Sequence, residues 1–193
     1  MSEDALARAV EAIADLPRDR RVLVAVDGVD GAGKTTFADR LAPRLDRPVV
    51  RASEDDFLNP AAIRHRRGRE SPEGFFRDSY DLALLEQLLL DPFAAGRPYR
   101  RRAFDVLADA PVVSVDENAP AGALLLLDGM FLHRDELRGR WDLSILLDVP
   151  PELSAERLLA RDGKPTRPRY VLGQQRYFAE CDPRRRASLV LPW

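Results

Sequence analysis

Hydrophobic residues fall along the chain in two alternating patterns, short apolar runs and helical repeats. The short runs are rich in valine, leucine and isoleucine, which is typical of strands buried on both faces of a sheet, and they cover residues 21–27, 49–52, 123–127, 143–149 and 188–191. Between them, apolar residues recur at intervals of three and four, which predicts helices over residues 5–16, 34–45, 78–90, 150–161 and 170–180. Strands that alternate with helices predict an α/β fold, a three-layer sandwich with a mainly parallel sheet of about five strands and helices on both faces.

The stretches between these elements predict loops rather than a second domain. Residues 54–75 lack periodicity and contain at most a short helix, and a β-hairpin is expected from residues 101–106 and 112–115. A chain of 193 residues is about one domain long, and no repeat or linker divides it. We therefore expect one domain over residues 1–193, with a helix in the first 17 residues and a small lid at residues 161–169.

Composition and charge narrow the classes of partner. Hydrophobic residues make up 45% and charged residues 32% of the chain, and the formal net charge is −2. This balance is that of a folded protein, and it provides no overall field that attracts nucleic acid or anionic membranes. The single cysteine, Cys181, excludes an internal disulfide, and neither a signal peptide nor an apolar run of membrane-spanning length is present. We expect a cytoplasmic protein that acts on a small molecule without a nucleic-acid or membrane partner; a homo-oligomer is compatible with the sequence.

Residues 28–35, GVDGAGKT, match the phosphate-binding P-loop pattern G-x-x-x-x-G-K-[ST] between a predicted strand and a predicted helix. Glycines let successive backbone N–H groups turn toward phosphate oxygens, and the start of the helix adds partial positive charge. The lysine of such a loop reaches the β- and γ-phosphates, and the hydroxyl after it ligates Mg²⁺. The residues expected to bind ATP are Gly28, Asp30, Gly31, Ala32, Gly33, Lys34, Thr35 and Thr36.

An acidic segment, SEDDF at residues 53–57, directly follows the second predicted strand. Ligands of α/β sheets bind at the carboxyl ends of the strands, so these acids should face the P-loop. Phosphoryl transfer to an alcohol needs a group that accepts the hydroxyl proton, and a carboxylate can do this. An alternative is that the cluster only caps the segment that follows it.

With these motifs the chain resembles the uridine kinase and phosphoribulokinase-like family of P-loop kinases. The resembling segments span most of the chain: VDGVDGAGKTTFADRLA (26–42), SEDDF (53–57), SPEGFFRDSYD (71–81), LLLLDGMFLHRDELRGRWDLSILLDVP (124–150), ERLLARD (156–162) and RYVLGQQRYFAECDP (169–183). The resemblance implies a P-loop NTPase fold and a kinase that uses ATP and Mg²⁺ to phosphorylate a small-molecule hydroxyl.

The resemblance also implies roles for individual acids. Asp55 matches the family's catalytic base and also lies near Mg²⁺, and Asp128 matches the acid that, with Thr35, helps to hold Mg²⁺. Asp56 is grouped with the acceptor residues, with its role left open. Asp78 and Asp81 are the carboxylates available to grip ribose hydroxyls, although either could instead cap the following helix.

The basic segments admit two interpretations each. The family's lid carries arginines that stabilise the transferring phosphoryl group, which makes Arg161, Arg167 and Arg169 candidates; a solvated loop is the alternative. The arginine clusters at residues 64–69 and 97–102 are either solvated faces or forks for a phosphate or carboxylate on the acceptor.

The acceptor is where the resemblance departs from uridine kinases. Phe104 stands where those enzymes read the pyrimidine with a tyrosine, and no histidine accompanies it, so this ring can stack on a base but cannot hydrogen-bond it. We expect an ATP-dependent kinase of a nucleoside or of a similar ribosyl or polyol acceptor. A kinase of an already phosphorylated sugar and a nucleotide-binding switch without an acceptor remain the alternatives.

Overall fold

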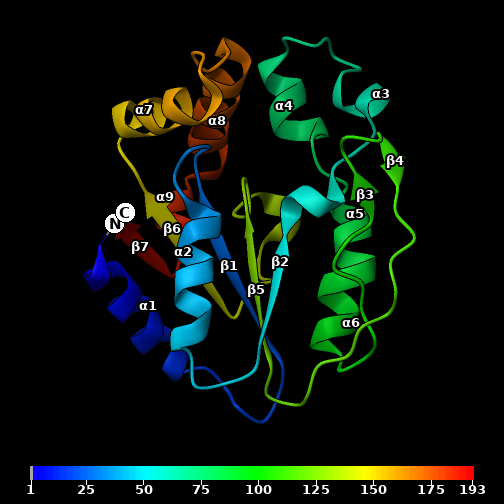
Figure 1. Ribbon diagram of the computed structural model, residues 1–193, viewed down its shortest axis with the longest axis vertical. Helices are drawn as coiled ribbons and strands as arrows, with labels where there is room; N and C mark the ends of the chain where they lie inside the picture. The colour runs from blue at the N-terminus through cyan, green and yellow to red at the C-terminus, as the bar shows by residue number, and fades with distance from the viewer. Residues whose placement is uncertain (1) are drawn as a thin grey trace.

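A five-stranded sheet forms the centre of the molecule (Figure 1), in the computed structural model, which describes residues 2–193. The strand order is β2-β5-β1-β6-β7, and every neighbouring pair is parallel. The strands are β1 Val22–Gly28, β2 Val49–Ser53, β5 Leu124–Gly129, β6 Leu143–Asp148 and β7 Leu189–Pro192. The predicted α/β class and the number of strands are thus confirmed.

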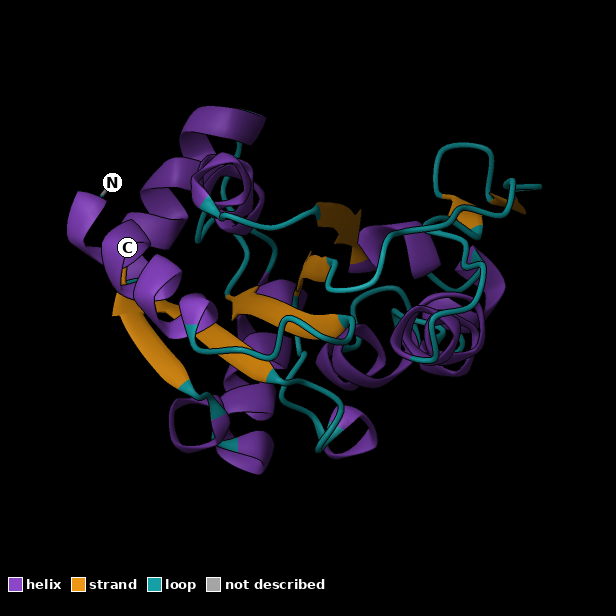
Figure 2. Ribbon diagram, turned by 90° about the horizontal axis from the view of Figure 1, so that it is seen from below, coloured by secondary structure: helices purple, strands orange, loops and turns teal. Residues whose placement is uncertain are grey.

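Two apolar layers cover the sheet, which is why its central strands carry apolar residues on both faces. Val24 of β1 packs on one side with α1 (Glu3–Ala14) and α2 (Lys34–Leu41). Leu23 of the same strand packs on the other side, against the helical segment at residues 82–94. Figure 2, which looks along the layers from below, shows helices on both sides of the strands.

Four short helices lie on the β2 side of the sheet: α3 Ala61–Arg64, α4 Pro72–Asp78, α5 Leu82–Leu85 and α6 Asp91–Ala94. A π-helical stretch, Glu86–Leu90, joins the last two. The prediction of a single helix over residues 78–90 is therefore wrong at its start, because α4 ends at Asp78 and α5 begins at Leu82. The break arises at Asp81, whose carboxylate accepts the N–H of Leu84 at 3.0 Å and so caps a new helix at Leu82.

The predicted hairpin exists but is shorter, with β3 at Phe104–Asp105 and β4 at Ala110–Pro111. Pro111 has no N–H for the ladder, and the Asp105 carboxylate instead accepts the N–H groups of Leu107 and Ala108. The pairing therefore stops after two residues on each side.

Residues 161–169, predicted to form a lid, include the end of one helix and the start of the next. Both helices lie above the carboxyl ends of the strands (Figure 1). Helix α7, Pro151–Asp162, ends at Gly163, whose φ of +66° suits glycine, and α8 runs over Pro168–Cys181. Arg161 thus belongs to α7 and Arg169 to α8, with a loop between them. The remaining helical pieces are α9, Pro183–Arg186, and 3-10 turns at Ala42–Arg44, Glu54–Phe57 and Asp135–Leu137.

Within residues 2–193, no helix combines the length and the hydrophobicity that a membrane crossing requires.

Candidate active site

The P-loop forms the turn between β1 and α2, as its sequence predicts. Gly31 and Gly33 have φ values of +74° and +84°, a region that residues with a Cβ rarely adopt. The Lys34 ammonium lies along the loop and donates to the carbonyl oxygens of Gly28 and Val29, both at 3.0 Å. Burial lowers the pKa of Lys34, and the charge of Asp27 acts in the opposite direction. The lysine is therefore held at the place where phosphate oxygens would replace the carbonyls.

Helices α7 and α8 hold the outer part of this loop. Ser154 of α7 donates its hydroxyl to the Asp30 carbonyl at 2.6 Å. The Asp30 N–H in turn donates to the Gln174 side chain of α8 at 2.7 Å. Sequence reasoning missed both partners, because their contact with the P-loop spans more than 120 residues of chain.

The root of the loop is fixed by a buried network around Asp27, the residue that precedes the motif. One carboxylate oxygen accepts the Gly28 N–H at 2.7 Å. The other accepts the Tyr177 hydroxyl at 2.5 Å and faces His133 Nδ1 at 2.7 Å. Burial alone would raise the pKa of Asp27, but His133 and Tyr177 bring it below its ordinary value. Asp27 is therefore a charged, hydrogen-bonded anchor for the start of the P-loop.

Thr35 of α2 and Asp128 of β5 are in direct contact. The Thr35 hydroxyl donates to one Asp128 oxygen at 2.7 Å, and Arg51 pairs with the other oxygen at 2.8 Å. Residues 2–193 contain no group of three acidic, histidine or cysteine side chains suited to a metal. The donors are all oxygen, however, and Mg²⁺ commonly uses one or two protein oxygens and takes its other ligands from water and phosphates. The pair therefore fits a Mg²⁺ ion that a nucleotide brings with it.

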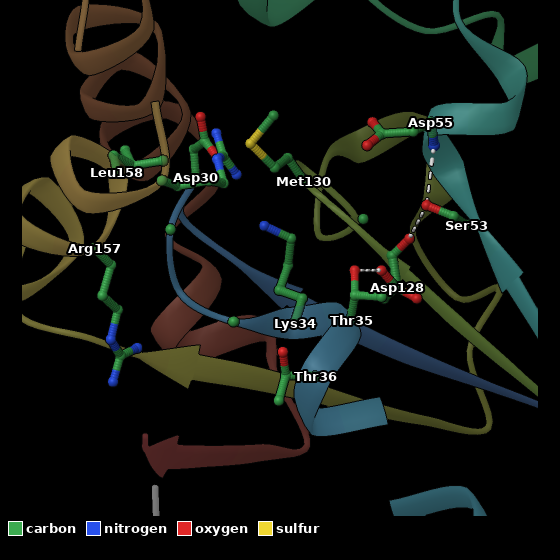
Figure 3. Close-up of a pocket in the computed structure, with 14 residues that line it drawn as sticks. Asp30, Lys34, Thr35, Thr36, Ser53, Asp55, Asp128, Met130, Arg157 and Leu158 are labelled. Carbon is green, nitrogen blue, oxygen red and sulfur yellow. Dashed lines mark hydrogen bonds and ion pairs between the residues drawn. The ribbon is translucent and has the colours of Figure 1, made fainter. Parts of the chain in front are cut away.

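Asp55 lies in the 3-10 turn that follows β2. Its carboxylate accepts the Tyr80 hydroxyl at 3.0 Å. Figure 3 shows Asp55 on one side of a cavity, with Lys34, Thr35 and Asp128 on the other. The predicted base and the predicted phosphate-binding residues thus share one space.

We call this space the donor cavity; its volume is about 330 Å³. The P-loop, the ends of β2 and β5 and one side of α7 line it. Among the predicted lid arginines, Arg161 is the one that reaches it, 3.5 Å from the Asp30 carboxylate. Arg157, which sequence reasoning did not single out, also lines the cavity and donates to the Ala32 carbonyl.

A second cavity, of about 270 Å³, adjoins the first and shares Asp55 and Met130 with it. We call it the acceptor cavity. Three aromatic rings, four arginines and a histidine contribute to its walls: Phe75, Tyr80, Tyr170, Arg64, Arg69, Arg167, Arg169 and His65. The predicted lid residues Arg167 and Arg169 thus lie here rather than in the donor cavity. Of these wall residues, sequence reasoning missed the three rings, Phe75, Tyr80 and Tyr170, because apolar and aromatic residues near a helix resemble core residues.

The four residues predicted to contact the acceptor line neither cavity. Asp56 pairs with Arg102 at 3.2 Å, and Asp81 caps a helix, the alternative left open by the sequence. Phe104 is buried in the hairpin.

Asp78 also lies outside both cavities, because nearer partners take its carboxylate. It is buried, and it binds Arg66 at 2.5 Å and Arg67 at 2.9 Å. Burial would raise the pKa of Asp78, but the two arginines hold it below its ordinary value. Asp78 therefore orders the arginine-rich segment that precedes it.

Glu54, next to Asp55, is fully buried against the end of β5. One carboxyl oxygen accepts the Met130 N–H at 3.0 Å. Burial, followed by the charges of Asp55 and Asp27, raises the pKa of Glu54 well above its ordinary value. Gly129 makes this contact possible, since a Cβ built there would lie 2.6 Å from the Glu54 Cβ.

Substituting Gly129→Ala is therefore expected to lower the free energy of unfolding by about 1–3 kcal/mol, the usual cost of overpacking. Chemical denaturation measures this change. Gly74→Ala is the matched control, because a Cβ there meets its nearest neighbour at an ordinary 3.4 Å, and we expect it to change stability by less than about 1 kcal/mol. Equal effects of the two substitutions would contradict the close approach of Glu54.

Known proteins are similar to this chain in sequence and in fold. Thymidylate kinases from Xanthomonas euvesicatoria pv. vesicatoria and Xylella fastidiosa are each 30% identical to the chain over 159 residues. Each alignment covers 75% of this chain, but 63% of the Xanthomonas protein and 69% of the Xylella protein. The chain thus spans less than two thirds of the Xanthomonas relative.

Solved structures share the fold at lower identity. The structure of a possible uridine kinase from Bacillus stearothermophilus matches with a TM-score of 0.79 at 22% identity, over 97% of each chain. Phosphoribulokinase from Rhodobacter spheroides matches with a TM-score of 0.58 at 18% identity, over 86% of this chain and 66% of that one. A family model matches residues 23–169, which include the P-loop, Asp55, Asp128 and helix α7. On this match, the chain belongs to the phosphoribulokinase / uridine kinase family of P-loop kinases.

Proposed function

We propose that the protein transfers the γ-phosphoryl group of ATP to a hydroxyl of a small molecule bound in the acceptor cavity. One observation carries this proposal: the Asp55 carboxylate lines both the cavity that contains the P-loop and the cavity beside it. A base in this position can take a proton from an acceptor hydroxyl while the hydroxyl oxygen faces the phosphate. A nucleotide-binding switch has no use for a base placed in this way.

In this mechanism Asp55 orients the acceptor hydroxyl and accepts its proton. Tyr80 fixes the carboxylate by donating to one of its oxygens, which leaves the other free for the acceptor. Lys34 would leave the carbonyl oxygens of the loop and bind the β- and γ-phosphates, and Arg161 would add positive charge from the α7 side. Both cations then oppose the charge that develops on the transferring group.

Thr35 and Asp128 are the residues proposed to hold Mg²⁺. The ion, when bound, neutralises negative charge on the phosphates. The Arg51–Asp128 pair keeps one carboxylate oxygen oriented and leaves the oxygen near Thr35 for the metal.

The acceptor in this proposal is a ribosyl or polyol compound. The acceptor cavity, at about 270 Å³, has the size for such a molecule. Its rings, Phe75, Tyr80 and Tyr170, suit a flat sugar face or a base. A nucleoside remains within this class, although base recognition would fall to these rings rather than to Phe104.

The test is a search for acceptor-dependent ADP. The protein is incubated with ATP and Mg²⁺ and a panel of nucleosides, polyols, sugar phosphates and hydroxy acids, and ADP is measured against a reaction without acceptor. The proposal predicts that at least one acceptor raises the rate and becomes phosphorylated. ADP formation at the acceptor-free rate throughout the panel would contradict a kinase and favour the switch.

A further inference from the structure

Arg169 is a buried cation without a carboxylate partner in the described chain. Only 5% of its surface is exposed, and no acidic group of residues 2–193 lies within ion-pair distance of it. Its guanidinium lies over the rings of Phe75 and Tyr170, 5.6 Å and 5.0 Å from their centres. Its Nη1 donates to the Arg69 carbonyl, and its Nε has no hydrogen-bond partner among these residues. Buried charges are normally paired, so this arrangement lacks an anion.

The described side chains around Arg169 leave its charge uncompensated. His65 Nδ1 lies 3.5 Å from its guanidinium, and Arg69 lines the same cavity with no ion pair among residues 2–193. Arg64 and Arg167 are also on the wall, although each is paired, with Asp109 and Glu70 respectively. Among the described residues, Asp55 is the only carboxylate on this wall, on the side shared with the donor cavity.

The effect of this charge is visible at His65. Burial and then the positive charges of Arg169, Arg64 and Arg69 lower the pKa of its imidazole. A negative group bound among these side chains would offset that repulsion. The arginines on this wall therefore carry an excess of positive charge, which a bound anion would balance.

We infer that the acceptor carries an oxyanion of its own, a phosphate monoester or a carboxylate, which binds Arg169, Arg69 and His65 while its hydroxyl faces Asp55. The inference rests on the proposed function and specifies its acceptor. Guanidinium groups bind both kinds of oxyanion through paired hydrogen bonds, and the unpartnered Nε of Arg169 is one such donor. A neutral nucleoside or polyol would leave Arg169 unpaired.

The first arm of the test measures anion binding without chemistry. The P-loop is filled with a non-hydrolysable ATP analogue and Mg²⁺, and inorganic phosphate and acetate are then titrated by calorimetry. We expect saturable binding by the unmodified protein, weakened about tenfold or more in Arg169→Gln. Arg69→Gln serves as a second variant, because this side chain is exposed and its loss does not threaten folding. Arg100→Gln, which removes a partly exposed arginine that pairs with Asp116 and is not part of the cavity wall, is the control and should bind as the unmodified protein does.

The second arm compares matched acceptors that differ only in the anion. Ribose is paired with ribose 5-phosphate, and glycerol with glycerate, and kcat/KM is measured for each. We expect the anionic member of at least one pair to be preferred by about tenfold or more, and the preference to disappear in Arg169→Gln and Arg69→Gln. Whether the phosphate or the carboxylate pair shows the preference identifies the group that is recognised.

The outcomes separate this inference from the proposed function. Neutral acceptors used as well as anionic ones, with no phosphate or acetate bound, would overturn the inference and leave the kinase intact. Anion binding that Arg169→Gln abolishes, without turnover of any acceptor, would support the anion site and count against the proposed reaction.

Discussion

Replacing Asp55 by asparagine is expected to lower acceptor-dependent ADP formation by about 10²-fold or more, the usual contribution of a general base. The amide keeps the size of the side chain and can still accept the Tyr80 hydroxyl, so the turn after β2 should retain its structure. The amide cannot take the acceptor proton. Turnover should therefore fall while the affinity for the nucleotide stays within a few-fold, as measured by steady-state kinetics and by nucleotide titration.

The neighbouring aspartate provides the matched control. Asp56 has the same chemistry one residue along the chain, but it lines neither cavity and pairs with Arg102. Asp56→Asn should change turnover by no more than a few-fold. If the two substitutions had equal effects, or if Asp55→Asn lost only a few-fold, the base would have to be assigned elsewhere.

A second large effect is expected from Lys34→Met, which removes the ammonium but keeps a chain of similar length. Loss of a cation that opposes charge on the transferring phosphoryl group should lower kcat by about 10²- to 10³-fold, as loss of an electrostatic stabiliser does in other enzymes. Nucleotide affinity should fall as well, because the lysine also binds the phosphates before the reaction. Single-turnover measurements at saturating ATP separate the two effects.

The chain has only two lysines, so the other one serves as the control. Lys164 lies in the exposed loop between α7 and α8, outside both cavities. Lys164→Met should leave kcat and nucleotide affinity unchanged. A Lys34→Met protein that folds and retains more than about a tenth of the activity would contradict the role given to Lys34.

The P-loop and the two aspartates of the donor cavity could be predicted from the sequence because each is marked by a short local pattern. The P-loop is a continuous motif, and the strand before it and the helix after it can be identified from a few residues each. Asp55 follows β2 and Asp128 lies at the end of β5, and the rule that ligands bind at the carboxyl ends of a parallel sheet brings them to the loop. The three central strands were equally accessible, since burial on both faces leaves a nearly continuous apolar run in each.

The acceptor side depends on contacts between distant segments, which no local pattern reveals. Asp78 was assigned to the acceptor, but Arg66 and Arg67 are nearer and occupy its carboxylate. Arg169 was assigned to a lid over the phosphates, whereas α8 places it against Arg69, 100 residues earlier. The start of the helix at Leu82 was missed because a capping carboxylate, rather than a change in hydrophobicity, separates it from α4.

Helix α8 limits how the proposed activity can be extended to a new acceptor. Its side chains Gln174 and Tyr177 bind Asp30 of the P-loop and Asp27 directly before it, and Arg169 on the same helix lines the acceptor cavity. A change that moved this helix to suit another substrate would also disturb the grip on the nucleotide. The segment from Ala61 to Glu70 has no hydrogen bond to the P-loop. Directed evolution toward new acceptors should therefore concentrate its substitutions in that segment and leave the inner face of α8 unchanged.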